Sequence, residues 1–88
     1  MITRNVTVTA NKGLYARAAT CFIQKAVSYQ SAIWIENGDR RINAKSLLGV
    51  LSLGITEGMT VSLIADGKDE LDALDALTEL IGTATVEA

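Results

Sequence analysis

The segment KGLYARAAT, residues 12–20, combines features that favour phosphate with a side chain that cannot transfer it. Gly13 provides a hinge before a helical pattern that opens without an Asp or Ser cap, so free backbone N–H groups can bind an anion. Arg17 adds a guanidinium in the first helical turn, although a solvated surface role is the alternative. Tyr15 stands where chemistry would be expected, and a phenol of pKa about 10 is a poor nucleophile at neutral pH. The segment predicts phosphate binding without a reactive group.

Ser46 is a second candidate for chemistry because it directly precedes an apolar segment that begins at Leu47. Serine is a preferred helix N-cap, so a purely structural role is one interpretation. A phosphate on an N-cap serine would also suit the helix dipole and would add charge without unfolding the helix. The segment is apolar on nearly every side, so we expect some of Leu47, Leu48 and Leu51 to stay exposed. The pattern predicts either a plain helix cap or a binding surface that phosphorylation switches.

Other reactive groups are scarce in the 88 residues. The chain has no histidine, which removes the commonest general base and metal ligand. Its one cysteine, Cys21, cannot form an intramolecular disulfide, which fits a reducing cytoplasm. We expect Cys21 to be a small buried residue beside Phe22, with a redox role as the less favoured alternative. These counts predict a protein that is not an enzyme and that holds no metal and no cofactor.

The length and composition favour one domain over residues 1–88. Hydrophobic residues make up 49% of the chain and charged residues 20%, which is typical of a globular protein. No apolar run approaches the ~18 residues that span a bilayer, and no signal-peptide pattern opens the chain. Residues 1–45 carry a net charge of +5 and residues 46–88 a net charge of −7. A basic surface suited to acidic partners or phosphate groups is one expectation, and charges that only solvate their own faces are the other.

Alternation of apolar and polar residues predicts three strands, and an Asn-Gly pair predicts a hairpin into a fourth. These strands cover residues 6–10, 33–36, 40–43 and 61–65. Apolar residues at helical spacing predict helices that begin at Ala16, at Leu47 and after Asp69. Asp69 is expected to cap the last helix and Gly82 to end it. The order β-α-β-β-α-β-α favours an α+β open-faced sandwich, with helices on one face of a four-stranded, mostly antiparallel sheet and a wetter opposite face.

Three segments of the chain resemble the HPr family, the small phosphocarriers of the bacterial sugar phosphotransferase system. They are GLYARAAT, NAKSLLGVLSLG and ADGKDELDALDAL, and the resemblance runs over nearly the whole chain. It implies the HPr-like open-faced sandwich with the same order of elements. In the family a histidine accepts phosphate from the first enzyme of the system and donates it to sugar-specific permease components. Tyr15 holds that position here, and Ala18 replaces the proline that normally follows the arginine, so the resemblance implies that the histidine relay is lost.

The resemblance also implies a regulatory role for Ser46. In Gram-positive bacteria an HPr kinase/phosphorylase modifies this serine, and the modified protein binds a LacI-type repressor as corepressor in carbon catabolite repression. The chain is similar to the catabolite repression HPr-like (Crh-type) branch, which has lost the histidine and kept the serine, although that branch typically has glutamine in place of Tyr15. The implied protein is a cytoplasmic regulatory phosphoprotein. Its phosphate- and partner-binding residues would be Tyr15, Arg17, Lys45, Leu47, Leu48 and Leu51.

Two other functions stay open at this point. One is an altered phosphocarrier that still works in sugar transport, with components of the phosphotransferase system as partners. The other is a small anion-binding hydrolase of the acylphosphatase type, which is disfavoured because no Asn/Arg pair follows a recognisable phosphate loop. Direct nucleic-acid binding is weaker still, because aromatic residues make up only 5% of the chain and no strand could stack bases on them. We expect no membrane partner either.

Overall fold

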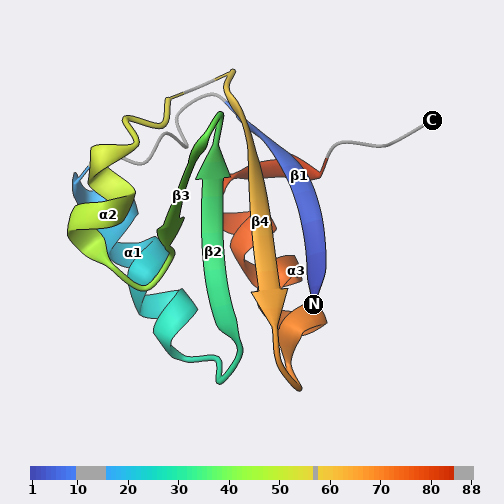
Figure 1. Cartoon of the computed structure of the whole chain (residues 1–88). Coiled ribbons are helices and arrows are strands. Elements are labelled where there is room, and N and C mark those ends of the chain that lie inside the picture. Colours follow the sequence, from blue (N-terminus) through green and yellow to red (C-terminus); the bar gives the residue numbers. More distant parts are fainter. Residues whose placement is uncertain (10–15, 57, 85–88) are drawn as a thin grey trace.

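A single antiparallel sheet organises the computed structural model, which describes residues 1–9, 16–56 and 58–84. Within these residues the sheet has five strands in the order β3-β2-β4-β1-β5. The strands are β1 (Ile2–Val8), β2 (Ala32–Asn37), β3 (Arg40–Asn43), β4 (Thr60–Asp66) and β5 (Gly82–Ala84). The helices α1 (Ala16–Val27), α2 (Leu47–Ser52) and α3 (Glu70–Ile81) cover one face of the sheet (Figure 1). The predicted α+β open-faced sandwich is therefore confirmed, with β5 as an addition.

β5 extends the sheet beyond the four predicted strands. It pairs with β1 in the register Val8↔Gly82 and Val6↔Ala84. Gly82 ends α3, as predicted, and also allows this pairing, because a Cβ at that position would collide with the carbonyl oxygen of Thr7. Three residues are too few to show an alternating pattern, so the sequence carried no signal for β5.

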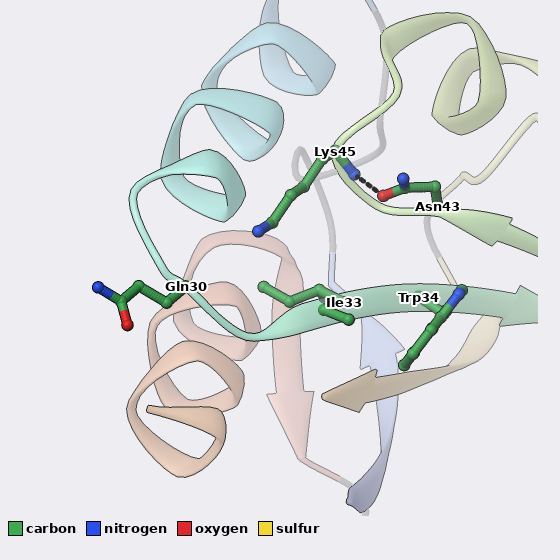
Figure 2. Close-up of a pocket in the computed structure, with 6 residues that line it drawn as sticks. Gln30, Ile33, Trp34, Asn43 and Lys45 are labelled. Carbon is green, nitrogen blue, oxygen red and sulfur yellow. Dashed lines mark hydrogen bonds between the residues drawn. The ribbon is translucent and has the colours of Figure 1, made fainter. Parts of the chain in front are cut away.

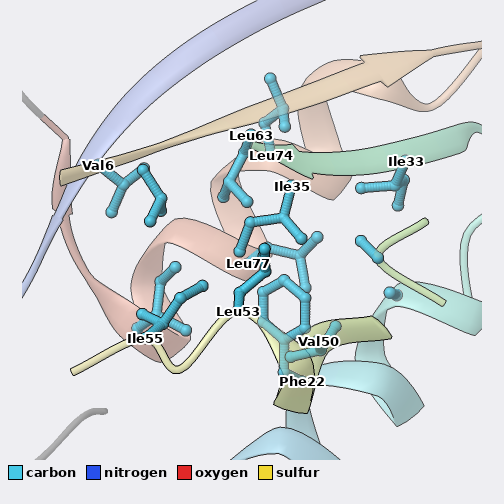
Figure 3. Packing of buried hydrophobic residues seen from close by; sticks show 14 of the residues in the cluster. Val6, Phe22, Ile33, Ile35, Val50, Leu53, Ile55, Leu63, Leu74 and Leu77 are labelled. Atoms are coloured by element: carbon cyan, nitrogen blue, oxygen red, sulfur yellow. The ribbon is translucent and has the colours of Figure 1, made fainter. Parts of the chain in front are cut away.

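The core lies between the sheet and the helices, where side chains from both layers interdigitate (Figure 3). Phe22 of α1 and Val50 of α2 are fully buried, and Leu74 and Leu77 place α3 on the same cluster. Burying each such side chain contributes about 1.5–3 kcal/mol, so this cluster fixes where all three helices lie. Among the described residues no helix is long and apolar enough to cross a membrane.

Cys21 is exposed, so the prediction that it is buried was wrong. Successive residues of an α-helix point about 100° apart, and Phe22 takes the direction that faces the core. Ala19 and Ala26 are buried with Phe22 because they lie three and four residues from it on the same face of α1. Adjacency to a core residue in sequence is therefore a poor guide to burial in a helix.

Asp69 occupies the predicted N-cap position of α3, where its carbonyl accepts the bond from Ala73 N at 2.9 Å, but its side chain makes no capping hydrogen bond. The carboxylate instead accepts a hydrogen bond from the Ser31 hydroxyl and one from each of the Gln30 and Ser31 backbone N–H groups, both at 2.9 Å. The Ser31 hydroxyl, followed by the Gln30 N–H, lowers the pKa of Asp69 below its ordinary value. Asp69 thus fastens the turn before β2 to the start of α3.

Polar side chains pair across strands on the open face of the sheet, in agreement with the wetter face expected there. The pairs are Arg41 with Glu36, Ser62 with Asn5, and Thr7 with Thr60. Ile64 departs from this pattern, since it is only 3% exposed although no helix covers this face. Its cross-strand neighbours are Trp34 on β2 and Thr3 on β1. The half-buried Trp34 therefore lies on the open face next to an apolar neighbour, which gives it a packing role.

Candidate functional site

Ser46 forms the N-cap of α2, as predicted. Its backbone is extended, with φ −105° and ψ 115°, and its Oγ accepts a hydrogen bond from the Gly49 N–H at 3.2 Å. The Ser46 carbonyl accepts the first helical hydrogen bond, from Val50 N at 2.9 Å. The side chain is exposed, and no acceptor for its hydroxyl proton is found among the described residues. The oxygen therefore caps the helix while the hydroxyl stays open to solvent.

Three leucines of α2 form an exposed surface that we call the leucine patch. Leu47 is 41% exposed, Leu48 82% and Leu51 37%. Positions three and four residues apart share one side of a helix, which brings these side chains together. Val50 points the other way and is fully buried, so it anchors α2 to the core. The leucine patch and the Ser46 hydroxyl therefore occur on one short helix held against the sheet layer.

Lys45 does not direct its charge to this surface in the structure. Its ammonium group donates a hydrogen bond to the Tyr29 carbonyl at 2.9 Å, just beyond the C-terminal end of α1. Its backbone N–H donates to the Asn43 side chain at 2.8 Å. A lysine suits a helix C-terminus, where carbonyl groups lack partners. Lys45 thus ties the loop before Ser46 to the end of α1, and its predicted role in phosphate binding stays a prediction.

A hollow of about 330 Å³ opens beside Lys45 at one end of the β2-β3 hairpin (Figure 2). Figure 2 shows the Lys45 side chain extending away from Asn43, while their hydrogen bond joins the loop to β3. The hollow is lined by Gln30, Ala32, Ile33, Trp34, Asn43 and Lys45. Lys45 is the charged residue of this lining, and one of its three ammonium donors is bound to the Tyr29 carbonyl.

The side chains of two predicted binding residues, Tyr15 and Arg17, are not described by the structure. Tyr15 lies outside the described residues, and Arg17 is described only as a backbone position in the first turn of α1. Helix α1 packs against α2, so the two predicted segments belong to neighbouring helices. The structure brings Ser46 and the leucine patch together, and it leaves the roles of Tyr15 and Arg17 as predictions.

Sequence reasoning missed a contact at the other end of α2. Arg40, the first residue of β3, donates from Nη1 to the Ser52 carbonyl at 3.0 Å and from Nη2 to the Ser52 hydroxyl at 3.1 Å. The sequence predicted Arg40 as the start of a strand and as part of the basic first half of the chain, but not as a contact of α2. One available signal was the sequence of α2 itself, LLGVLS, which has no charged residue to complement its own dipole.

The fold and the exposed serine cap define a small open-faced sandwich of the phosphocarrier type. A family model described as "PTS HPr component phosphorylation site" matches residues 2–83. The chain therefore belongs to the HPr family of the phosphotransferase system.

Relatives from two branches of the family are similar to the chain. The HPr-like protein Crh of Halalkalibacterium halodurans is 42% identical over 81 residues, which cover 92% of this chain and 96% of the relative. The phosphocarrier protein HPr of Neisseria meningitidis is 37% identical over 81 residues, covering 92% and 91%. Identities of 42% and 37% are too similar to assign the chain to one branch, so the assignment depends on the residues at the functional positions.

Solved structures confirm the fold in both branches. HPr-C-His from Thermoanaerobacter tengcongensis has a TM-score of 0.87 at 41% identity, over 92% of this chain and 91% of that one. Crh of Bacillus subtilis, described as a dimer with a swapping domain, has a TM-score of 0.69 at 40% identity over 88% of each chain. The open-faced sandwich is thus common to HPr and Crh, and the fold by itself does not choose between them.

Proposed function

We propose that this chain is a regulatory HPr-like phosphoprotein that is modified on Ser46 and cannot carry phosphohistidine. The observation that carries the proposal is an exposed N-cap serine beside the leucine patch in a chain without histidine. The modifying enzyme would be an HPr kinase/phosphorylase, and the modified form would bind a LacI-type repressor as corepressor in carbon catabolite repression. This places its action in the cytoplasm.

Phosphorylation of Ser46 would change the surface more than the fold. The phosphate adds about −1.5 to −2 charges at the start of α2, where the dipole tolerates a negative group. The first turn of α2 has no acidic residue to repel it, and the Gly49 N–H remains available as a donor. An arginine of the partner could pair bidentately with the phosphate while the leucine patch supplies apolar contact. The modification would therefore create a two-part binding surface.

The lack of histidine argues against a phosphocarrier. A phosphoryl group on an imidazole nitrogen has high transfer potential, whereas a phenol ester at Tyr15 would hold its phosphate firmly. The second candidate, an altered phosphocarrier that contacts components of the phosphotransferase system, is favoured by the 37% identity to the Neisseria phosphocarrier. It would require a phosphoryl acceptor other than histidine.

Phosphorylation by an HPr kinase/phosphorylase and ATP, followed by mass spectrometry, tests the proposal. We expect one phosphate per chain, located on Ser46, and none on the Ser46→Ala variant. Ser28→Ala is the matched control, because Ser28 is also exposed and lies at a helix end, where its hydroxyl donates to the Lys25 carbonyl at 2.6 Å. A wild-type protein that stays unmodified, or one modified elsewhere, would contradict the proposal.

A further inference from the structure

Helix α2 is too short to be stable by itself. It has six residues, whereas isolated helices shorter than about 12–15 residues are marginal in water. Gly49 lies in its middle and weakens it further. Its first turn has no acidic residue and its last turn no basic one, so no charge of its own offsets the dipole. Groups outside the helix must therefore hold its two ends.

Four hydrogen bonds join these two ends through the helix. Arg40 donates to the Ser52 carbonyl at 3.0 Å and to the Ser52 hydroxyl at 3.1 Å. The Ser52 hydroxyl donates to the Gly49 carbonyl at 2.6 Å. The Gly49 N–H donates to the Ser46 Oγ at 3.2 Å. A continuous series of contacts thus runs from the guanidinium on β3 to the serine that begins α2.

Arg40 bonds α2, whereas the neighbouring Arg41 bonds another strand. Arg41, the next residue, points to the open face of the sheet, where its Nε donates to Glu36 at 3.0 Å. Arg40 points to the helix side, and the partner that the structure gives it within the described residues is Ser52. A cation at the C-terminal end of a helix complements the dipole, and a planar fork can bond a carbonyl and a hydroxyl together. Arg40 supplies the charge that α2 lacks.

We infer that Arg40 is a positioning residue for Ser46, acting through the C-terminal end of α2. By holding Ser52, Arg40 keeps α2 formed, and a formed α2 presents the Ser46 hydroxyl and the leucine patch in one arrangement. The apparent affinity of a partner that recognises this arrangement is its intrinsic affinity multiplied by the fraction of molecules in which α2 is formed. The inference rests on the proposed function, because the kinase that reads Ser46 is part of it.

Hydrogen exchange and phosphorylation kinetics of the full chain test the inference together. For Arg40→Gln we expect the Gly49 and Val50 amides to exchange about threefold to fivefold faster, the size of a lost dipole and cap contact. We expect KM for the protein in phosphorylation by an HPr kinase/phosphorylase to rise by the factor by which the formed fraction of α2 falls, with kcat little changed. Arg40→Lys should recover part of both effects, because lysine can bond the carbonyl but lacks the fork.

Arg41→Gln is the matched control, since it removes the same charge one residue away on the opposite face of β3. It should leave both exchange and KM at their wild-type values. Combining Arg40→Gln with Ser52→Ala should give less than the sum of the two single effects, because both changes remove the bond between Arg40 and the Ser52 hydroxyl. Equal behaviour of Arg40→Gln and Arg41→Gln would overturn the inference. So would faster exchange with an unchanged KM, which would leave Arg40 as a helix contact that does not position Ser46.

The two readouts separate this inference from the proposed function. If the wild-type protein is not phosphorylated, the proposed function fails, and a positioning role for that reaction fails with it. The exchange rates then still decide whether Arg40 holds α2. If the wild-type protein is phosphorylated and the variants do not differ, only the inference fails.

Discussion

At the scale of single residues, the Ser46 oxygen is both a helix cap and the candidate phosphoryl acceptor. Capping uses an oxygen lone pair, through the Gly49 N–H at 3.2 Å, and leaves the hydroxyl proton unused. Modification can therefore proceed without first breaking the helix start. Tyr15 is unsuited to a relay, because a phenol ester would hold its phosphate firmly, unlike a phosphoryl group on an imidazole nitrogen. The residue scale thus favours a switch at Ser46 over a relay at Tyr15.

Restoring an imidazole at position 15 should return part of the lost relay. The Tyr15→His variant should accept phosphate from phosphoenolpyruvate through the first enzyme of the phosphotransferase system, at a rate below that of a histidine-bearing HPr. Ala18 lacks the fixed φ with which proline would preset the helix start. Labelling with radioactive phosphoenolpyruvate measures this, and the wild-type chain should stay unlabelled. An acid-labile phosphate on the wild type, or no label on a folded Tyr15→His, would contradict this account.

Asp69 is expected to make the stability of the protein depend on pH. Its folded pKa is lowered, first by the Ser31 hydroxyl and then by the Gln30 N–H, so the carboxylate stabilises the fold when ionised. This stabilisation is present above the ordinary aspartate pKa of about 3.9 and is lost as pH falls from there through the lowered folded pKa. Asp69→Asn should therefore lower Tm at neutral pH, and the difference from wild type should shrink in acid.

Thermal unfolding followed by circular dichroism at several pH values would check this prediction. Asp72→Asn is a suitable control, since Asp72 is exposed in the first turn of the same helix. It should change Tm little at any pH. A constant Tm difference between wild type and Asp69→Asn across the acid range would show that the loss comes from packing and not from the charge.

At the scale of elements, local patterns predicted where the helices begin, missed the first four residues of β1, Ile2 to Asn5, and failed where distant segments meet. The start of α1 at Ala16 and the cap of α2 at Ser46 follow from periodicity and residue type within a few positions. The acceptor of the Lys45 ammonium lies 16 residues away and the donors to Asp69 lie 38 and 39 residues away, so no local pattern could reveal them. Tyr15 and Arg17 illustrate the other limit, because the structure leaves their predicted role untested.

Gly82 connects α3 to β5 and lies beside β1, so replacing it tests how these elements are joined. A Cβ there would collide with the Thr7 backbone, which cannot move without disturbing the β1-β5 pairing. We expect Gly82→Ala to destabilise the protein by a few kcal/mol. Gly38→Ala is the control, because Gly38 has φ 66° but open space around it, and should cost about 1–2 kcal/mol. Urea unfolding measures both, and an equal or smaller loss for Gly82→Ala would contradict this view of β5.

At the scale of the whole molecule, the fold joins the basic first half of the sequence to the acidic second half where Arg4 Nη1 of β1 lies 2.6 Å from Asp75 Oδ1 of α3. The acidic helix α3 and the helix α2 lie over different parts of the sheet (Figure 1). The basic residues around α2 are engaged within the protein more fully than their types suggested. Arg40 bonds Ser52 and Lys45 bonds the Tyr29 carbonyl, whereas Arg41, on the opposite face of β3, bonds Glu36. These neutral acceptors leave the charges of Arg40 and Lys45 in place, and a phosphate on Ser46 would add negative charge beside the leucine patch.

The central claim is that a phosphate on Ser46 converts this surface into a binding site, and a titration of a LacI-type catabolite repressor tests it most directly. The repressor would be titrated with the unmodified protein, the Ser46-phosphorylated protein, and the Ser46→Ala and Ser46→Asn variants after the same kinase treatment. Ser46→Asn keeps a good N-cap without a hydroxyl, so it separates loss of the phosphate from loss of the helix cap. We predict strong binding by the phosphorylated form alone, at least 100-fold tighter than by the others, which corresponds to about 2.7 kcal/mol. Equal affinity for all four forms would contradict the account and would reduce Ser46 to a helix cap.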